Sequence, residues 1–498
     1  MRRDLDRLAG GTFDLLILGG GITGAGVALD AVLRGLKVAL IDKGDFASGT
    51  SSVSSKLVHG GLRYLEHAQL SLVREALTER GRLLRNAPHL VQPLRFLLPF
   101  YRGARVAPWQ WRAALTLYDL LAGRANIRRS RPVTSHQLLR ECPVLCAAGL
   151  RAGAQYFDAQ MDDARLCLEV ILTAARQGAC VANYVEATAF EMANGAIHAV
   201  RAVDRHGGRE LRIAARLVLN ATGPWVDRVA ALAGDPAGPR LQVTKGVHII
   251  VADQKLPAAF LLLHPRDGRV FFVLPWLGKT LLGTTDTFTP EDADHLSVQD
   301  ADIDYLLEGW NRHFTRPLSR PDVLGYFAGL RPLLRSTGAS PSARSRQFRL
   351  FTSPSGLLSA AGGKYTTYRS MARQITDEIC RRLGVRRPCR TADFRLLGAP
   401  AEPWADFVAT ATPRLMGRHG LSETAALHLL RRYGLRAIDV AARIQRPEDS
   451  RPVSAGEPDL EVELAYQREC EMALTHEDVL FRRTRLGLFQ QHASLARC

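Results

Sequence analysis

The chain has 498 residues, of which 46% are hydrophobic and 23% are charged, and its formal net charge is +17 at pH 7. This composition is typical of a globular protein, excludes a disordered one, and at this length indicates two or three domains. Because no apolar run reaches about eighteen residues, we expect no transmembrane helix. Residues 1–11 lack an apolar core, so we do not expect a secretory signal there.

The basic excess is spread along the whole chain. A nucleic-acid-binding protein concentrates its basic residues on one helix or tract, so the sequence does not favour a nucleic-acid partner. Attraction to an anionic substrate or membrane surface stays open, as does an arginine-rich coding bias without a function. The eight cysteines include no C-x-x-C pair and no zinc-site spacing, so we expect reduced thiols in a cytosolic protein and no metal.

The first predicted element is a short buried strand, residues 13–18, whose apolar run ends in a glycine-rich turn. Gly19, Gly21 and Gly24 match the G-x-G-x-x-G fingerprint of dinucleotide-binding proteins. In that fingerprint the first glycine permits a tight turn and the second lets the backbone approach a pyrophosphate. The third lets the following helix pack close to the sheet.

A helix, a second strand and an acidic residue follow at the spacing that such a site needs. The pattern predicts a helix over residues 24–34, whose N-terminal N–H groups face the phosphates, and a strand over residues 37–41. Asp42 ends this strand, where an acidic side chain accepts hydrogen bonds from an adenosine ribose. We therefore predict a βαβ dinucleotide site; the alternative is a glycine-rich turn in an unrelated sheet.

Three later segments favour FAD over NAD, although the βαβ unit serves both cofactors. They are rich in glycine or hydroxyl side chains, and the last two follow apolar runs: 47–55, 220–225 and 362–364. A flavin enzyme holds its cofactor with several separated segments of the chain, which fits this distribution. Glycine turns after strands are common in all α/β proteins, so these segments alone do not decide the cofactor.

Eight short motifs along the chain carry a family resemblance. They are Ser-Gly-Thr-Ser-Ser (48–52) after the glycine loop, Ser-Lys-Leu-Val-His-Gly-Gly-Leu-Arg-Tyr-Leu (55–65), Asp-Asp-Ala-Arg (162–165), Asn-Ala-Thr-Gly-Pro-Trp (220–225), Lys-Gly-Val-His (245–248), Gly-Thr-Thr-Asp (283–286), Gly-Leu-Arg-Pro-Leu (329–333) and Gly-Gly-Lys-Tyr-Thr-Thr-Tyr-Arg (362–369). With them the chain resembles the FAD-dependent, quinone-linked glycerol-3-phosphate dehydrogenases, within the D-amino-acid-oxidase-like flavoproteins. The resemblance runs nearly end to end.

The resemblance implies an α/β fold: a Rossmann-like FAD-binding domain, an antiparallel-sheet substrate cap and a C-terminal helical domain. The residue patterns agree, with short β-rich runs at 246–251, 270–275 and 280–285 and helical patterns at 424–433 and 460–474. We expect the FAD-binding domain in residues 1–75, 150–240 and 346–390, the cap in 76–149 and 241–345, and the helical domain in 391–498.

Two segments near the predicted cap are amphipathic. Residues 70–90 alternate apolar and charged residues at helical spacing. Residues 104–122 combine Trp109, Trp111 and several leucines with arginines, which suits a helix lying on a membrane. A helix that covers the domain core is the commoner case. The resemblance favours the membrane, because members of the family are peripheral membrane proteins that pass electrons to quinone.

Oxidation of a phosphorylated secondary alcohol requires a hydride acceptor, a base for the hydroxyl proton and cations for the phosphate. The resemblance implies a catalytic set of His59, Arg63, Arg331 and Lys364, and a substrate-binding set of Arg63, Tyr64, His248, Arg331 and Arg346. It implies cofactor contacts from Gly19, Gly21, Gly24, Asp42, Thr50, Ser51, Ser52, Thr222, Gly223, Gly363 and Lys364. His59 is our first choice of base and His248 the second; a structural role is the alternative for each.

Three further features near the motifs need an interpretation: one cluster of charged residues and two single positions. We interpret the Asp162, Asp163 and Arg165 cluster as structural ion pairs at a helix start. The family more often has Glu where this chain has Asp42, so a shorter side chain must reach the ribose. Tyr365 stands where Ile or Leu is usual, beside the expected flavin site. Neither departure removes a catalytic group.

The sequence thus predicts an FAD enzyme that oxidises sn-glycerol 3-phosphate to dihydroxyacetone phosphate and passes electrons to a membrane quinone. Three alternatives stay open: an oxidase that produces hydrogen peroxide, an amine or amino-acid oxidase of the same fold, and a non-catalytic membrane-associated flavoprotein. We expect a cytoplasmic protein that is held at the inner face of the cell membrane by the anionic surface of that membrane. The oligomeric state is not readable, and a homodimer stays open.

Overall fold

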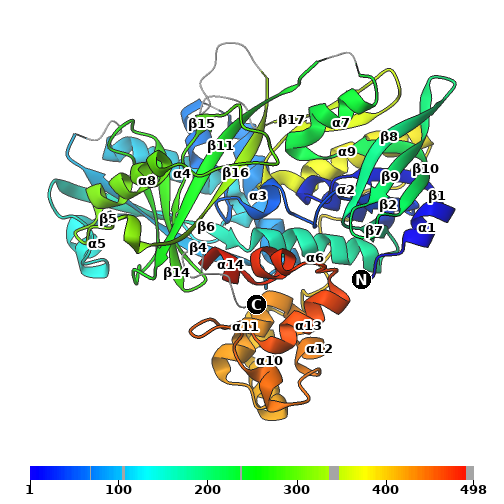
Figure 1. Cartoon of the computed structure of the whole chain (residues 1–498). Helices are drawn as coiled ribbons and strands as arrows, with labels where there is room; N and C mark the ends of the chain where they lie inside the picture. The colour runs from blue at the N-terminus through cyan, green and yellow to red at the C-terminus, as the bar shows by residue number, and fades with distance from the viewer. Residues whose placement is uncertain (68, 104–106, 236–237, 336–346, 490–498) are drawn as a thin grey trace.

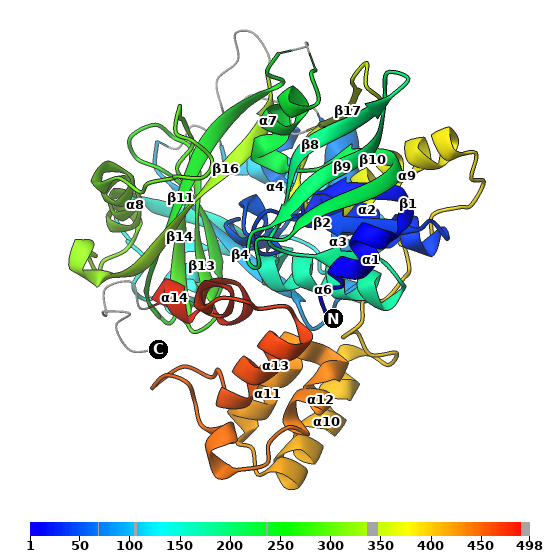
Figure 2. The ribbon, with the colours of Figure 1, turned by 45° about the vertical axis from the view of Figure 1, so that its right-hand side comes forward.

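The computed structural model describes residues 1–67, 69–103, 107–235, 238–335 and 347–489, except for the side chains of residues 63, 66 and 67. Two β-sheets lie side by side with helices packed on them, and a bundle of helices lies below (Figure 1). The view turned by 45° shows the same three parts (Figure 2). The expected α/β fold with a helical C-terminal domain is confirmed.

The first sheet has a parallel core in the order β18-β10-β1-β2-β7, extended by antiparallel strands at one side and by the β8–β9 hairpin. Its strands are β1 Thr12–Leu18, β2 Val38–Ile41, β7 Cys180–Ala182, β8 Val185–Ala193, β9 Ala196–Asp204, β10 Glu210–Asn220, β17 Phe348–Thr352 and β18 Leu358–Gly362. Three helices pack together on this sheet: α2 Ile22–Leu33, α6 Asp163–Arg176 and α9 Tyr368–Leu383.

The predicted βαβ unit is confirmed as β1, α2 and β2. Strand β1 is buried over its last four residues, as a continuous apolar run predicts for a strand covered on both faces. Helix α2 begins two residues before the predicted start, because Gly21 already takes the extended conformation of an N-cap. The chain leaves the helix through Gly35, whose φ of +80° favours glycine. Asp42 follows β2 directly.

The second sheet has the order β15-β11-β14-β13-β12-β4-β6-β3, with β16 paired to β11 and β5 to β6. Its strands are β3 Leu57–Val58, β4 Val91–Tyr101, β5 Arg131–Thr134, β6 Leu150–Met161, β11 Leu241–Ala252, β12 Ala259–Leu263, β13 Val270–Trp276, β14 Lys279–Gly283, β15 Thr287–Phe288 and β16 Val323–Leu334. The three predicted β runs lie in β11, β13 and β14, which pair antiparallel as expected. One pair in this sheet, β4 with β12, is parallel.

One predicted domain boundary differs from the structure. We assigned residues 150–161 to the FAD-binding domain, but β6 pairs with β4 along almost its whole length and therefore belongs to the second sheet. The chain returns to the first sheet only at α6. The sequence does not show which sheet β6 joins, because pairing partners are chosen by tertiary packing.

The remaining helices of this two-sheet body are α1 Leu5–Gly10, α3 Leu70–Asn86, α4 Pro108–Ala122, α5 Ser135–Glu141, α7 Val226–Leu232 and α8 Asp300–His313. The predicted helix over 70–90 is α3, which ends at Asn86 and buries its apolar face. Helix α4 buries Leu115 and Tyr118, yet Trp109 is 70% exposed and Leu120 is 72% exposed. It thus covers the core with one face and presents an apolar outer face with the other.

The C-terminal part is a helical bundle with its own core. Its helices are α10 Trp404–His419, α11 Glu423–Tyr433, α12 Ala437–Ala441 and α13 Glu461–Cys470. After α13 the chain returns to the two-sheet body through the π-helix η10, Asp478–Thr484, and α14, Leu486–Phe489 (Figures 1 and 2). Across the described residues, none of the helices combines the length and apolar character that crossing a membrane requires. The seven cysteines among the described residues are free thiols.

Candidate active site

A cofactor cleft opens where β1, β2 and β10 end. Gly19 has φ +108°, and a Cβ on it would lie 2.6 Å from the carbonyl oxygen of Ala221. A Cβ on Gly24 would lie 1.9 Å from the carbonyl oxygen of Gly19. The turn and the helix are therefore packed so closely that neither position accepts a side chain, as the fingerprint predicts.

The N-terminus of α2 forms one wall of this cleft. The backbone N–H of Ile22 donates to Ser51 Oγ at 2.9 Å, which brings the 48–52 loop against the start of the helix. Unpaired N–H groups and the positive end of the helix dipole make this wall suitable for a diphosphate. The cleft encloses about 1370 Å³, its open mouth included. This space is deep enough and long enough to take a dinucleotide.

Asp42 lines the cleft directly after β2. Its carboxylate accepts the backbone N–H groups of Gly20 at 2.7 Å and Gly44 at 2.9 Å. Burial raises the pKa of Asp42 to about 6, against the effect of these two hydrogen bonds. An ionised carboxylate has about four acceptor positions, so it can also accept ribose hydroxyls.

Most of the other residues expected to touch the cofactor line the same cleft. They are Gly21, Thr50, Ser51, Thr222, Gly223, Gly363 and Lys364. Gly24 and Ser52 do not line it: Gly24 acts through its close contact with Gly19, and Ser52 is buried behind the loop. Tyr365 also lines the cleft, and its hydroxyl donates to the backbone carbonyl of Asp163 at 2.6 Å. The larger side chain thus ties the cleft wall to the start of α6.

A second cavity of about 1000 Å³, its mouth included, adjoins the cleft. The polar side chains that line it come from strands of the second sheet, from the loops next to these strands and from the β3–η2 turn: Ser55, His59, Tyr64, Tyr156, Asp158, Arg269, Thr284, Asp286 and Arg331. Lys364 Nζ donates to the backbone carbonyl of His59 at 2.8 Å. This hydrogen bond joins the cofactor cleft to the cavity wall, so a ligand in the cavity lies beside the cofactor.

Two arginines supply positive charge to this cavity. On β16, Arg331 pairs with Asp286 at 2.9 Å and donates to Thr284 Oγ1 at 2.9 Å, which fixes the plane of its guanidinium. Arg269, at the start of β13, donates to the backbone carbonyl of Asp286 at 2.8 Å. Fixed guanidinium groups on one wall can bind a phosphate through paired hydrogen bonds.

The comparisons with known proteins agree with this geometry. Residues 14–369 match the family described as FAD dependent oxidoreductase, and residues 389–497 match the C-terminal domain of alpha-glycerophosphate oxidase. The glycerol-3-phosphate dehydrogenase of Synechocystis sp. is 38% identical over 98% of this chain and 91% of its own length. The mitochondrial enzyme of that name from Rattus norvegicus is 38% identical over 97% of this chain and 68% of its own.

This chain belongs to the FAD-dependent glycerol-3-phosphate dehydrogenase family. The glycerol-3-phosphate dehydrogenase of Bacillus halodurans, solved in complex with FAD, is 33% identical with a TM-score of 0.82, covering 98% of this chain and 89% of that one. The L-alpha-glycerophosphate oxidase of Mycoplasma pneumoniae, at 18% identity and a TM-score of 0.58, shares the fold. The resemblance found in the sequence is confirmed, and the cofactor is FAD.

Three other predicted site residues of this flavoenzyme are His248, Arg63 and Arg346. His248 is buried behind the cavity, stacks on Phe327 and contacts Ser55 Oγ through Nε2 at 2.9 Å. Burial and the charges of Arg331 and Lys56 hold its pKa well below the usual value, so it is neutral at pH 7. It reaches the cavity only through Ser55. Arg63 lies in the 3-10 turn η2, Leu62–His67, but its side chain is outside the described residues, as is Arg346.

Two cavity residues, Arg269 and Asp158, have no counterpart in the sequence prediction. Arg269 precedes a predicted β run without a recognisable motif, so only the sheet brings it to Asp286, the residue that also pairs with Arg331. Asp158 lies on β6; Tyr118 Oη donates to it at 2.8 Å and Arg80 pairs with it at 2.6 Å. Burial raises the pKa of Asp158, and Arg80 opposes that shift. The partners of Asp158 are 40 and 78 residues away in sequence.

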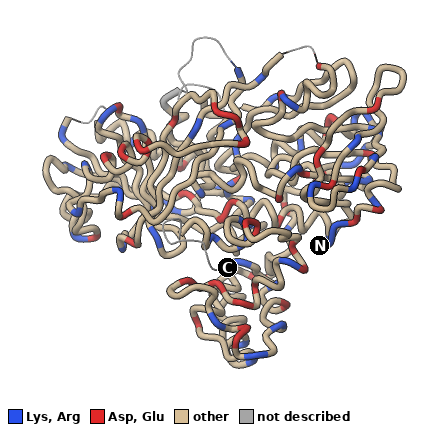
Figure 3. The backbone as a smooth tube through the Cα atoms, in the orientation of Figure 1, with Lys and Arg blue, Asp and Glu red and all other residues tan. Residues whose placement is uncertain are grey.

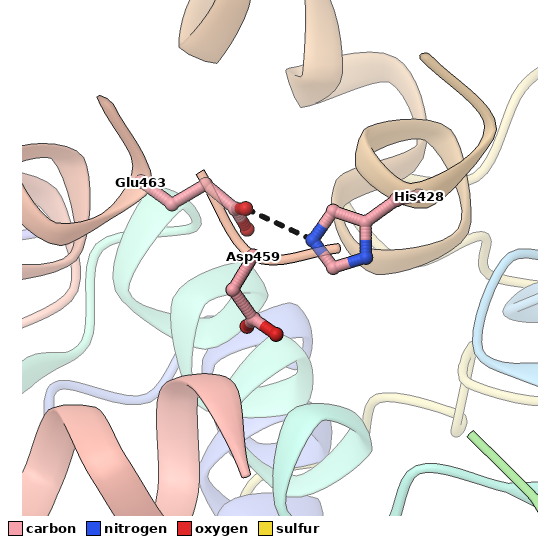
Figure 4. Close-up of side chains that lie close together, drawn as sticks. All are labelled: His428, Asp459 and Glu463. Atoms are coloured by element: carbon pink, nitrogen blue, oxygen red, sulfur yellow. Dashed lines mark hydrogen bonds and ion pairs between the residues drawn. The ribbon is translucent and has the colours of Figure 1, made fainter. Parts of the chain in front are cut away.

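One group in the described residues has the spacing of metal ligands: His428, Asp459 and Glu463, in the C-terminal bundle (Figure 4). His428 Nε2 lies 2.9 Å from Glu463, and Arg432 pairs with both carboxylates. The guanidinium already supplies the positive charge that a metal ion would bring. We interpret the group as a charge-balanced structural network and assign no metal to it.

Proposed function

We propose that this chain oxidises sn-glycerol 3-phosphate to dihydroxyacetone phosphate by hydride transfer to FAD and passes the electrons to a membrane quinone. One observation carries the proposal: a cavity with two arginines and His59 opens beside the cofactor cleft, at Lys364. The relatives named glycerol-3-phosphate dehydrogenase, which align with nearly the whole chain, support the same substrate. A neutral amino-acid substrate would not require two cations on one cavity wall.

Four cavity residues and Lys364 have a role in this proposal. Arg331 and Arg269 bind the phosphate. Asp286 pairs with Arg331 at the same time and holds its guanidinium in place. His59 accepts the proton of the reacting hydroxyl, because it lines the cavity at the point where the cofactor cleft meets it. Lys364 places a positive charge at the same junction. When bound, FAD supplies the hydride acceptor.

The outer face of α4 supports the membrane part of the proposal. Trp109, Leu117 and Leu120 are exposed on it, and a groove beside Leu120 is lined by Arg74, Arg82, Arg85 and Arg124. An apolar ridge next to cations fits an anionic membrane surface, such as the inner face of a cell membrane. Elsewhere, basic and acidic residues are interspersed over the chain (Figure 3).

The decisive experiment is anaerobic reduction of the purified holoenzyme. We expect sn-glycerol 3-phosphate to bleach the long-wavelength flavin band and glycerol to leave it intact, because the arginines recognise phosphate. Equal bleaching by both alcohols would contradict phosphate recognition. An oxidised spectrum after addition of glycerol 3-phosphate would overturn the substrate assignment and leave the FAD cofactor standing.

An oxidase is the second candidate, because residues 389–497 match a domain described from alpha-glycerophosphate oxidase. Turnover should be measured with glycerol 3-phosphate in air, with and without a quinone analogue. We expect the analogue to accelerate turnover and to suppress peroxide. Stoichiometric hydrogen peroxide and no response to the analogue would establish the oxidase.

Membrane docking has its own test. The double variant Trp109→Ser/Leu120→Ser should sediment less with vesicles containing phosphatidylglycerol than the unchanged protein. Met192→Ser also removes an exposed apolar side chain, on β8, and serves as the control. Equal sedimentation of all three proteins would exclude α4 as the docking face.

A further inference from the structure

Residues 471–489 pack against elements of both sheets' domains, next to the two sites. After leaving the C-terminal bundle, η10 and α14 lie against α6 and β16 (Figures 1 and 2). Phe489 contacts Trp276 of β13 at 5.7 Å between ring centroids. This segment, residues 471–489, carries three arginines that are buried or nearly so: Arg482, Arg483 and Arg485. We call it the tail.

Arg483 of the tail, together with Arg482, holds the loop that follows β2. Arg483 binds Asp45 with both terminal nitrogens, at 2.6 and 3.0 Å, and Arg482 Nε reaches the same carboxylate at 2.6 Å. Asp45 is 1% exposed. Burial raises its pKa, but the two arginines outweigh burial and hold the pKa below its usual value. Its neighbours Asp42 and Ser48 line the cofactor cleft.

Arg485 of the tail holds the loop that follows Ser51. Arg485 pairs with Asp162 and lies 3.3 Å from Asp163, and Asp163 pairs with Lys56 Nζ at 2.8 Å. Lys56 Nζ in turn donates to the backbone carbonyl of Ser52 at 2.5 Å. The two predicted carboxylates at the start of α6 are therefore linked to the cofactor loop on one side and to the tail on the other. Arg165, which we predicted to be their ion-pair partner, pairs with Glu471 instead, at 2.6 Å.

Asp163 also fixes this loop directly. Its carboxylate accepts the N–H of Ser54 at 3.0 Å and the hydroxyl of Ser54 at 2.7 Å. The next residue, Ser55, lines the substrate cavity, and Lys56 is fully buried. The group holds two cations, Arg485 and Lys56, against two carboxylates. Removing Arg485 alone would leave an excess buried negative charge, which is costly.

We infer that Arg483 and Arg485 are positioning residues for FAD, each acting on one of the two loops that form the cofactor cleft. Arg483 acts through Asp45 on the loop after β2, and Arg485 acts through Asp163, which lies at the start of α6 and holds Ser54 and Lys56. The bidentate Arg483–Asp45 pair has a narrow geometry, so it transmits the position of the tail to the loop after β2. Arg485 Nη2 reaches both Asp162 and Asp163 and so ties the tail to the carboxylate that holds Ser54 and Lys56. A binding loop must be held within about 0.5 Å of its productive position. The C-terminal segment thereby becomes part of the cofactor site without touching the cofactor.

The test compares two charge-balanced double variants of the full-length holoenzyme. Arg485→Gln/Asp162→Asn removes one buried Arg–Asp pair of the tail and leaves Asp163 paired with Lys56. Arg432→Gln/Asp459→Asn removes a buried Arg–Asp pair inside the C-terminal bundle, away from both loops. The readouts are the rate of FAD release after dilution, followed by flavin fluorescence, and the unfolding temperature of the apoprotein.

We expect the tail variant to release FAD about tenfold faster than the unchanged protein, a difference of about 1.4 kcal/mol, and the bundle variant to release it at the unchanged rate. Both should unfold at a lower temperature. Arg485→Lys keeps the charge but loses the guanidinium, whose Nη2 reaches both aspartates while Nη1 donates to the backbone carbonyl of Phe481, and its release rate should fall between those of the other two proteins. Equal release rates in both double variants at equal loss of unfolding temperature would overturn the inference.

This inference rests on the FAD cofactor and not on the proposed substrate. A failure of glycerol 3-phosphate to reduce the flavin would leave the release rates unaffected. If Arg485→Gln/Asp162→Asn does not accumulate, Arg483→Lys and Arg485→Lys carry the same comparison, because each preserves the buried charge. FAD release at the unchanged rate in both lysine variants would contradict the inference.

Discussion

The cofactor cleft and the substrate cavity adjoin at Lys364 but are built in different ways. The cleft is formed mainly by backbone: glycines, strand ends and the first turn of α2. The cavity is formed by side chains that come from β3, β6, β13, β16 and the turns between them. Backbone that must approach a ligand requires particular residue types at fixed spacings. Side chains that converge in space require only that the sheet bring them together.

The largest expected effect tests the cavity. His59→Asn should lower kcat by about a hundredfold to ten-thousandfold, because the proposed base is lost, while the flavin spectrum stays unchanged. Stopped-flow reduction of the flavin by glycerol 3-phosphate measures the step directly. His198→Asn, at an exposed site on β9, is the control. A kcat within about twofold of the unchanged enzyme would remove His59 from the mechanism.

The next effect tests the cleft. Gly24→Ala places a Cβ 1.9 Å from a backbone oxygen that cannot move without shifting β1. An overpacking cost of about 3 kcal/mol predicts FAD binding weaker by about a hundredfold. Gly417→Ala adds a Cβ in open space on α10 and should leave FAD binding unchanged. Titration of apoprotein with FAD distinguishes them, and equal affinities would show that the cleft is more pliable than its packing indicates.

A third effect separates the two sites. Arg331→Gln should raise KM for glycerol 3-phosphate by about tenfold to a hundredfold, since a charge-assisted hydrogen bond contributes about 1.5–3 kcal/mol. The FAD dissociation constant should stay the same, because Arg331 faces the cavity. The surface cation Arg320, paired with Asp300 and Asp304, supplies the control Arg320→Gln. Loss of FAD in Arg331→Gln would mean that cavity and cleft are not independent.

The smallest effect concerns pH. The folded pKa of Asp42 is about 6, above its usual 3.8, so the apoprotein binds an extra proton between these values. That proton stabilises the fold below pH 4, and the stabilisation is lost as pH rises through 6. Binding of the ribose requires the carboxylate, so FAD affinity should fall as pH drops below 6, by at most about tenfold per pH unit.

Asp42→Asn provides the comparison for this pH dependence. The amide accepts hydrogen bonds with its carbonyl oxygen and does not titrate in this range. FAD binding by Asp42→Asn should therefore be weaker than that of the unchanged protein at pH 7 and independent of pH between 5 and 7. The same slope in both proteins would assign the proton to another group of the cleft.

The sequence alone determined the parts of this protein that depend on local spacing. The β1–α2–β2 unit, its glycines and Asp42 were predictable because a turn with positive φ, a close helix and a strand end each demand particular residues. The runs in β11, β13 and β14 were predictable because each is a short segment rich in β-forming residues. The motifs then indicated the family, and with it FAD.

The tertiary structure decided everything that depends on which distant segments meet. It assigned β6 to the second sheet, placed Arg269 in the same cavity as Arg331, and put His248 behind Ser55 instead of in the cavity. It also brought the tail beneath the cofactor loops, where Arg483 meets a residue 438 positions earlier. Such contacts leave no pattern in the chain, because an ion pair or a shared cavity constrains the distance between side chains in space and leaves their separation in sequence unrestricted.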